Sequence, residues 1–270
     1  MITELYQYRE LLKTSIKKEI RGKYKASFLG VLWSFINPLL QVLVYAIVFP
    51  YMMRDTGDDY IIYLVTGILP WTFFQTVINE CVISVKKNSG IIKKVYFPRV
   101  ILPLSSAISG LINFFISCLI ILFFCLIFKV GFSWHFLYAI PLAIIECVLA
   151  LGIGLALGAV DAYVQDLEYI VNFILMMAFY GSPIVYQMSL FESNTLFLKI
   201  IQLNPMTKII MGYRDAFLYH VTPPLTDFIY VSVIACIVLV LGYMIFKKLE
   251  KGFAEQFEDT DITEIQMDTV

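Results

Sequence analysis

Charged side chains are scarce in this sequence. Only 15% of its 270 residues are Asp, Glu, Lys or Arg, whereas soluble domains usually have about 25%. Hydrophobic residues make up 60%, and the mean hydropathy is +0.80. Because so few charges cannot cover the surface of a water-soluble protein of this size, the composition predicts a membrane protein. The net charge of −1 argues against a nucleic-acid partner.

Motifs for nucleotide binding and catalysis are also missing. The sequence has no G-x-x-x-x-G-K-[ST], since Gly22-Lys23 has neither the upstream glycine nor the following hydroxyl residue of a phosphate-binding loop. Neither G-x-S-x-G nor H-E-x-x-H occurs, and Asp259-Thr260-Asp261 lies in a polar tail. We therefore expect no enzyme activity and no cofactor or metal bound by this chain.

The cysteines form no disulfide or metal pattern. All five lie within apolar stretches, no two form a C-x-x-C pair, and neither histidine is near one. Free, buried thiols are therefore expected. Residues 1–28 are polar and basic, without the early apolar segment of a secretory signal peptide.

Six stretches are apolar and long enough to cross a bilayer as helices, which takes roughly 20 residues. They are residues 29–53, 61–83, 100–128, 137–160, 169–187 and 225–246. The predicted fold is all-α and polytopic, with a cytoplasmic interface helix over 1–28, a six-span domain over 29–246 and a cytoplasmic tail over 247–270. In the fourth span, Gly154 and Gly158 have the G-x-x-x-G spacing that predicts close helix packing.

The distribution of Lys and Arg predicts the orientation. With six spans, the segments on one side have fifteen basic residues in total and those on the other side have five. The richer set is 1–28, 84–99, 161–168 and 247–270, and the poorer set is 54–60, 129–136 and 188–224. Because basic segments tend to stay in the cytoplasm, both termini are predicted to be cytoplasmic.

Residues 1–28 have the pattern of an amphipathic helix. Their apolar residues recur at steps of three or four, at Leu5, Tyr8, Leu12, Ile16, Ile20 and Tyr24. Such a helix is expected to lie in the cytoplasmic interface, with the stripe toward the acyl chains and its basic residues toward lipid phosphates. The alternative is a basic anchor with no mechanical role.

Two connecting segments have unusual compositions. Residues 84–99 contain two basic pairs around Asn88-Ser89-Gly90 and are closed by Pro98, which suits a short cytoplasmic helix with an end that docks on another protein. The alternative is a loop that only fixes the topology. Residues 188–224 are external but rich in Leu, Phe, Ile and Met, which predicts one or two short helices that dip into the outer leaflet rather than an ordinary packed loop.

Ionisable residues inside the spans are few. Glu146 lies near the middle of the fourth span and Glu80 near the cytoplasmic end of the second. An acid in the membrane is a functional candidate; the alternative for Glu146 is a carboxyl hydrogen-bonded by neighbours such as Asn113 or Ser117. With no central cation, an ion-coupled carrier is poorly supported.

Aromatic residues make up 16% of the chain. Many lie near the ends of spans, where membrane proteins concentrate Trp and Tyr. Because aromatic faces pack well against sugar rings, deeper ones are candidates for lining a translocation pathway, with core or lipid-facing packing as the alternative. The candidates are Tyr45, Phe74, Phe114, Tyr180 and Tyr186.

Four motifs, in matching order over about residues 9–250, resemble those of a known family. They are R-G-K-Y-K-A-S-F-L-G-V-L-W-S-F-I-N-P-L-L at 21–40, K-V-Y-F-P-R-V-I-L-P at 94–103, S-P-I-V-Y at 182–186 and N-P-M-T-K-I-I-M-G-Y-R at 204–214. The chain thereby resembles the ABC-2-type permeases that export polysaccharides such as O-antigen, teichoic acid and rhamnose polymers.

This resemblance implies a permease in the bacterial cytoplasmic membrane that exports a lipid-linked polysaccharide. Its partners would be a second copy of the chain and two copies of a separate ATPase, which would bind ATP and Mg. Segment 84–96 would be the coupling helix, with contacts to the ATPase at Lys86, Lys87, Asn88, Ser89, Gly90, Ile91, Ile92, Lys93 and Lys94. Outer gate helices would include Asn204, Pro205, Tyr213 and Arg214.

Within that interpretation, Arg21, Lys23 and Lys25 are candidates for attracting the phosphate of the lipid carrier; the alternative is ordinary phospholipid contact. The sequence departs from the family where many members have Arg-Asp after the fourth span, because it has Gln165-Asp166. An ABC-2-type drug or lipid exporter is the alternative function. A membrane enzyme acting on lipid-linked glycans would need a polar catalytic cluster, which the sequence does not have.

Overall fold

The computed structural model describes residues 6–24, 33–52, 59–164, 166–188, 195–253 and 255–257. Every regular element in these ranges is a helix, so the predicted all-α fold is confirmed. The helices are α2 (Arg9–Tyr24), α3 (Trp33–Met52), α4 (Tyr60–Lys87), α5 (Ser89–Ile92), α6 (Ile101–Ile127), η2 (Trp134–Tyr138), α7 (Ala139–Asp161), α8 (Leu167–Tyr180), α9 (Thr195–Leu203), α10 (Pro205–Arg214), η4 (Asp215–Tyr219), α11 (Leu225–Leu249) and η5 (Glu250–Gly252).

Four helical stretches of the described chain are long and apolar enough to cross a membrane. They are α4, α6, η2 with α7, and α11 with η5, each 27 or 28 residues long. They coincide with the second, third, fourth and sixth predicted spans. The protein is therefore membrane-embedded, while the count of six spans stays a prediction.

The first and fifth predicted spans correspond to shorter apolar helices. In α3 the apolar part is Ile36–Val48, and α8 has only 14 residues. At 1.5 Å per residue, α8 is about 21 Å long, less than the roughly 30 Å of a hydrocarbon core. The prediction of a helix up to residue 187 is wrong for its last seven residues, because α8 ends at Tyr180 before Gly181-Ser182-Pro183. A proline disfavours the helical conformation of the residue before it.

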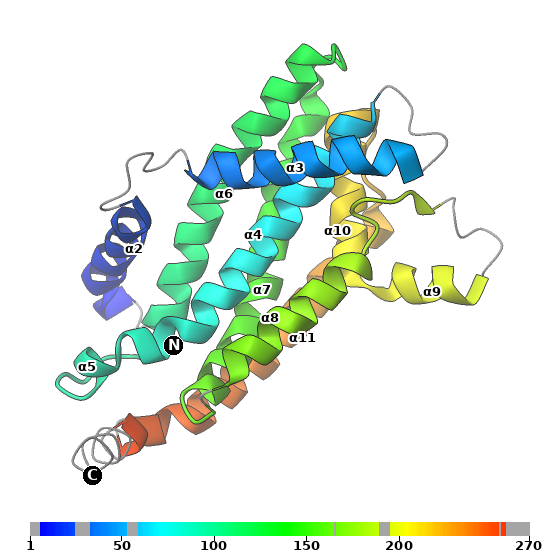
Figure 1. Cartoon of the computed structure of the whole chain (residues 1–270). Helices are drawn as coiled ribbons and strands as arrows, with labels where there is room; N and C mark the ends of the chain where they lie inside the picture. Colours follow the sequence, from blue (N-terminus) through cyan, green and yellow to red (C-terminus); the bar gives the residue numbers. More distant parts are fainter. Residues whose placement is uncertain are drawn as a thin grey trace, which may run out of the picture.

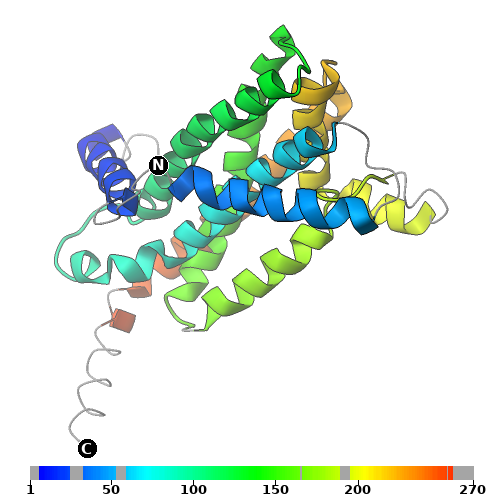
Figure 2. The ribbon, with the colours of Figure 1, turned by 45° about the horizontal axis from the view of Figure 1, so that its top comes forward.

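The long helices lie side by side, and α3 crosses in front of α4 and α6 (Figure 1). Both views place α2, α5 and η5 toward one end of the bundle and η2 and η4 toward the other (Figures 1 and 2). We call these the α5 end and the η2 end. The helix α9 projects from the side of the bundle.

Glycines allow the central helices to approach closely. A Cβ atom added at Gly158 would lie 2.7 Å from the carbonyl oxygen of Cys81, and one at Gly154 would collide with the Cys81 side chain. The predicted close packing at the G-x-x-x-G motif is therefore confirmed, between α7 and α4. A second close approach joins α7 to α11, where an added Cβ at Gly152 would lie 2.6 Å from the backbone nitrogen of Leu239.

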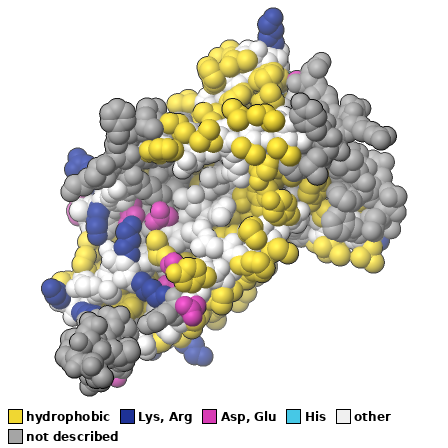
Figure 3. Space-filling view, in the orientation of Figure 1, with side chains coloured by type: hydrophobic (Ala, Val, Ile, Leu, Met, Phe, Trp, Pro, Cys, Tyr) yellow, Lys and Arg dark blue, Asp and Glu magenta, His cyan; other side chains and the backbone are white. Residues whose placement is uncertain are grey.

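Charged side chains gather toward the α5 end, whereas hydrophobic side chains cover much of the remaining surface in this view (Figure 3). The basic residues at this end include those of α2, the last turn of α4 and the last turn of α11. This placement agrees with a cytoplasmic α5 end under the positive-inside rule. The orientation of the termini stays a prediction.

Candidate functional sites at the two ends of the bundle

The predicted docking segment forms a short helix at a bend. The long helix α4 ends at Lys87, and α5 begins one residue later, after Asn88. The Asn88 carbonyl accepts hydrogen bonds from the backbone N–H groups of Ile91 and Ile92, at 3.0 and 3.2 Å. Asn88 itself is 7% exposed. The bend is therefore built around a buried amide side chain.

The nine predicted coupling residues divide into two groups. Lys86 Nζ lies 3.0 Å from the buried Asp161 carboxylate at the end of α7, and Ile92 is buried. These residues, together with Asn88, hold the segment on the bundle. Outward-facing positions include Lys87, Gly90, Ile91 and Lys94.

Two exposed residues next to α5 were not among those nine. Val95 is 59% exposed and Tyr96 is 86% exposed, and Ile91 on α5 is 46% exposed. We call these three residues the docking knob. Exposed apolar side chains next to basic residues are typical of protein-docking surfaces. The signal in the sequence was an aromatic residue between the basic pair and Pro98.

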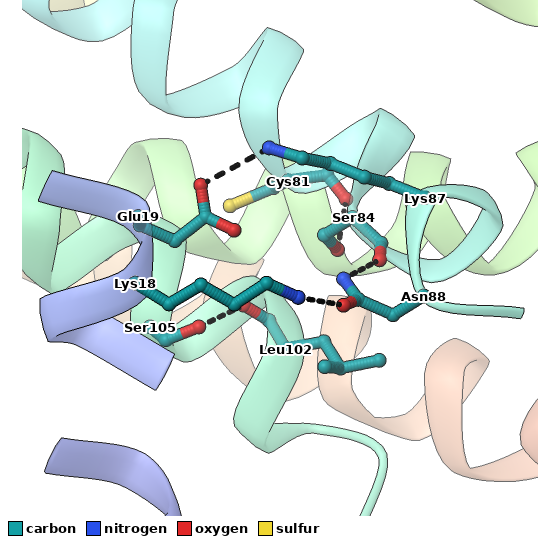
Figure 4. A network of polar contacts seen from close by, with 8 residues as sticks. All are labelled: Lys18, Glu19, Cys81, Ser84, Lys87, Asn88, Leu102 and Ser105. Atoms are coloured by element: carbon teal, nitrogen blue, oxygen red, sulfur yellow. Dashed lines mark hydrogen bonds and ion pairs between the residues drawn. The ribbon is translucent and has the colours of Figure 1, made fainter. Parts of the chain in front are cut away.

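The helix α2 is attached to this bend by two polar contacts (Figure 4). Lys18 Nζ donates to Asn88 Oδ1 at 3.1 Å, and Lys87 Nζ lies 3.2 Å from Glu19 Oε2. Glu19 is only 9% exposed. The sequence offered one weak signal for this contact, an acidic residue within the otherwise basic second half of α2.

The apolar stripe of α2 is partly covered. Leu12, Ile16 and Ile20 are half-buried, because α2 packs against α6. The position of this helix in the membrane interface stays a prediction. Of the candidate phosphate ligands, Arg21 is exposed. The side chain of Lys23 and all of Lys25 lie outside the described residues.

At the other end, Arg214 joins two of the sequence motifs. Its Nη1 donates to the Pro183 carbonyl at 2.7 Å and its Nη2 to the Ile184 carbonyl at 2.8 Å. Its guanidinium carbon lies 3.4 Å from the centroid of the Tyr63 ring. The side chain is completely buried, which lowers the pKa of Arg214 to about 10, so it stays charged at neutral pH. We call this arrangement the Arg214 joint.

The remaining predicted gate residues join the same elements. Asn204 Nδ2 donates to the Ser182 hydroxyl at 2.9 Å, and its Oδ1 accepts from the Met206 N–H at 3.0 Å, which caps α10. Pro205 is the first residue of α10, a position that tolerates the missing N–H of proline. Segments 182–186 and 204–214 therefore form one polar cluster.

Glu146 is bonded to the same helix. The Tyr213 hydroxyl of α10 donates to Glu146 Oε2 at 3.0 Å, and both side chains are completely buried. The partner is thus Tyr213 rather than the expected Asn113 or Ser117. This contact ties α10 to α7 near the middle of the bundle.

The predicted pathway aromatics are not equivalent in the protomer. Phe74 and Phe114 are 5% and 2% exposed, whereas Tyr180 is 56% exposed. Tyr45 stacks on Phe179 with 5.9 Å between ring centroids. The Tyr186 hydroxyl donates to the Tyr180 carbonyl at 3.2 Å. Only some of these rings are therefore accessible without rearrangement.

A polar stripe on α4 was not predicted. Thr72, Gln75, Thr76 and Asn79 follow one face of the helix at steps of one to four residues, and all are half-buried. Asn79 Nδ2 donates to Asn172 Oδ1 on α8 at 2.9 Å. A cavity of about 260 Å³ between α3, α4 and α6 borders the same stripe. Uncharged polar groups at half-exposed positions of a membrane helix indicate contact with water, a polar ligand or another subunit.

Comparison with known proteins agrees with this arrangement. The profile of the family described as ABC-2 type transporter matches residues 10–218. An "O-antigen export system permease protein RfbA" of Klebsiella pneumoniae is 32% identical over 250 residues, 91% of this chain and 94% of that protein. The protein of the same name from Myxococcus xanthus is 29% identical over 94% of this chain and 98% of its own length. A "Polysialic acid transport protein KpsM" of Escherichia coli is 20% identical over 87% of this chain and 92% of its own length.

Proposed function

Because this chain belongs to the ABC-2 type transporter family, we propose that it is the membrane subunit of an exporter for a lipid-linked cell-surface polysaccharide. The observation that carries the proposal is the similarity, over nearly the full length, to permeases named for O-antigen export. The similarity to a polysialic acid transport protein points to the same class of cargo. The membrane would be the bacterial cytoplasmic membrane, with both termini inside.

The energy would come from a separate ATPase that binds ATP and Mg. The sequence has no phosphate-binding loop of its own. At the α5 end, the docking knob offers an exposed apolar contact with basic residues beside it. Two copies of the chain and two of the ATPase would form the working exporter, in the cyclic symmetry that is commonest for homodimers.

In this mechanism, ATP binding draws the two ATPase copies together and displaces the docking knob. Asn88 and the Lys86–Asp161 ion pair connect that segment rigidly to α4 and α7. Displacement of α5 is therefore transmitted to the long helices as a rigid-body movement. The Arg214 joint and the Tyr213–Glu146 bond would transmit this movement to the polar cluster of segments 182–186 and 204–214.

The pathway for the cargo would lie along the polar stripe of α4 in the assembled dimer. The stripe offers hydroxyl and amide groups to sugars, and exposed rings such as Tyr180 offer flat apolar faces. Phe74 and Phe114 would reach the cargo only after a rearrangement, because they are buried in the protomer.

The test is co-purification and export. We expect a co-expressed ABC ATPase to co-purify with this chain, and replacement of residues 86–94 by a Gly-Ser segment to abolish its coupling. Cells without the chain should lose the surface polysaccharide and regain it when the chain is restored. An ATPase that neither co-purifies nor responds to altered 86–94 contradicts the proposal. Normal surface polysaccharide with loss of drug or lipid efflux favours the alternative exporter.

A further inference from the structure

Two consecutive residues of α2 bind two consecutive residues at the bend between α4 and α5 (Figure 4). Lys18 contacts Asn88 and Glu19 contacts Lys87, although these pairs are 70 and 68 positions apart in the sequence. We call the four residues the clamp. Two adjacent contacts restrict sliding and rotation more than a single contact does.

Asn88 connects three helices, two through its side chain and one through its backbone carbonyl. Its Nδ2 donates to the Ser84 carbonyl in the last part of α4 at 2.8 Å, while its Oδ1 accepts from Lys18 of α2. Its backbone carbonyl accepts from the first turn of α5. A change in the angle between α4 and α5 must therefore carry Lys18 with it or break that hydrogen bond.

The Glu19–Lys87 ion pair is unlike an exposed surface pair. The side chain of Glu19 is 9% exposed, whereas that of Lys87 is 48% exposed. A carboxylate removed from water needs its cationic partner, because a buried unpaired charge is strongly unfavourable. Separation of α2 from the end of α4 would leave Glu19 in that condition, so these two helices are held together.

The packing of α2 against the bundle is looser beside the clamp. A cavity of about 150 Å³ separates α2 from α6 there. Its lining includes Thr14 and Ser15 of α2 and Leu102 and Ser105 of α6. The rest of α2 packs along α6, so the unfilled space is confined to the part of this interface beside the clamp.

We propose that the clamp makes α2 and the bend between α4 and α5 a single moving unit. Displacement of the docking knob by a bound ATPase then shifts α2, with its exposed basic residues Lys17 and Arg21, along the membrane surface. Lys18, Glu19, Lys87 and Asn88 are positioning residues in this scheme. The inference rests on the proposed function, since it needs an ATPase at the α5 end.

Charge reversal tests the clamp in the complete complex with the ATPase. We expect Glu19→Lys alone and Lys87→Glu alone each to reduce export at least five-fold, with the ATPase still bound. The double variant should restore export to within two-fold of the wild type, because it rebuilds the pair with opposite polarity. The control is reversal of the exposed Glu10–Lys13 pair on the same helix, whose side chains are 73% and 68% exposed; it should leave export unchanged. Unchanged export in both single variants, or no rescue by the double variant, overturns the proposal.

A covalent tether provides a second test that does not depend on the charges. The double variant Lys18→Cys with Lys87→Cys removes one partner from each of the two clamp contacts. It is made in a Cys236→Ser background, because Cys236 is the exposed cysteine of the described chain. Export should fall in this variant and return when a short bis-maleimide links the two thiols. A linked complex that stays inactive overturns the proposal, because it would mean that α2 must leave the bend between α4 and α5.

Failure of the clamp is distinguishable from failure of the proposed function. If the ATPase does not co-purify with the wild-type chain, the proposed function is contradicted. If it co-purifies and export persists in both single charge reversals, only the clamp is contradicted.

Discussion

Arg214 allows a sharp prediction, because its side chain is completely buried and holds the segment after α8 against α10 and α4. Arg214→Met removes the bonds to the Pro183 and Ile184 carbonyls and the contact with the Tyr63 ring. Methionine occupies much of the same space but donates no hydrogen bond. The two carbonyls lose their charged donor inside the protein.

The expected cost follows from these contacts. A hydrogen bond to a charged group contributes about 1.5–3 kcal/mol, and a desolvated cation–π contact about 2 kcal/mol. Release of the buried guanidinium from its desolvation offsets part of this sum. We therefore expect Arg214→Met to lower the free energy of unfolding by about 4 kcal/mol. Arg214→Lys should cost about half as much, since a single ammonium group can replace one of the two bonds.

The assay is thermal unfolding of the purified protein in detergent, followed by tryptophan fluorescence. A loss of this size corresponds to a decrease in Tm of about 10 °C for a chain of 150–250 residues. The matched control is Lys208→Met on the same helix. Lys208 pairs with Asp227 at 3.0 Å, and both side chains are partly exposed, so the loss should stay within about 1 kcal/mol. If the two methionine variants unfold within 2 °C of each other, the reasoning about the Arg214 joint is wrong.

Three further predictions concern other contacts. Gly152→Ala should destabilise the protein by about 3 kcal/mol or prevent folding, because its Cβ would lie 2.6–2.7 Å from the α11 backbone. At Gly90 an added Cβ meets open space, so Gly90→Ala should leave the free energy of unfolding unchanged. Urea unfolding in mixed micelles distinguishes the two variants. Tyr213→Phe removes the donor to buried Glu146, with an expected loss of about 1–3 kcal/mol. The same change should cost less in a Glu146→Met background, which has no acceptor, and a non-additive double-mutant cycle checks the contact. Burial and the nearby Asp227 raise the pKa of Asp215 to about 6 from 3.8. Its contribution to the stability of the fold is therefore complete below about pH 4 and is lost as the pH rises through 6. The difference between the Tm values at pH 5 and pH 7.5 should be smaller in Asp215→Asn than in the wild type.

Composition and charge were sufficient to predict the all-α membrane fold. Apolar stretches of the necessary length leave few alternatives in a bilayer, and four of them are membrane-length helices in the structure. Helix ends were harder to predict. The fifth stretch remains apolar up to Tyr186, but Gly181-Ser182-Pro183 turns the chain after Tyr180. Hydropathy measures transfer to lipid and carries no information about that turn.

Segments were predictable where their own composition was unusual, and contacts between segments were not. The bend at Asn88-Ser89-Gly90 was expected from turn-forming residues, and α5 forms there. Nothing local to Glu19 indicates Lys87 as its partner, because the contact depends on how α2 packs along α6. The partner of Glu146 was predicted wrongly for the same reason. Asn113 and Ser117 were expected from the packing of neighbouring spans, whereas Tyr213 belongs to a short helix inserted between the long ones.

The buried ionisable groups identify the places where this bundle resists rearrangement. Burial of apolar surface is non-directional, whereas a buried polar or charged group is stable only with its partner. In the described part of the chain, each of the four buried Asp, Glu and Arg side chains contacts an element other than its own. Glu19 contacts Lys87, Asp161 contacts Lys86, Glu146 contacts Tyr213, and Arg214 contacts the carbonyls of Pro183 and Ile184. The first two contacts hold the α5 end together, and the other two join α10 to α7 and to the segment after α8. The polar stripe of α4, residues Thr72, Gln75, Thr76 and Asn79, has no charged side chain. A movement that passes from one end to the other is therefore expected to keep each end intact and to change the packing between them. Residues of the polar stripe, rather than these four contacts, should be the ones whose accessibility changes during the transport cycle.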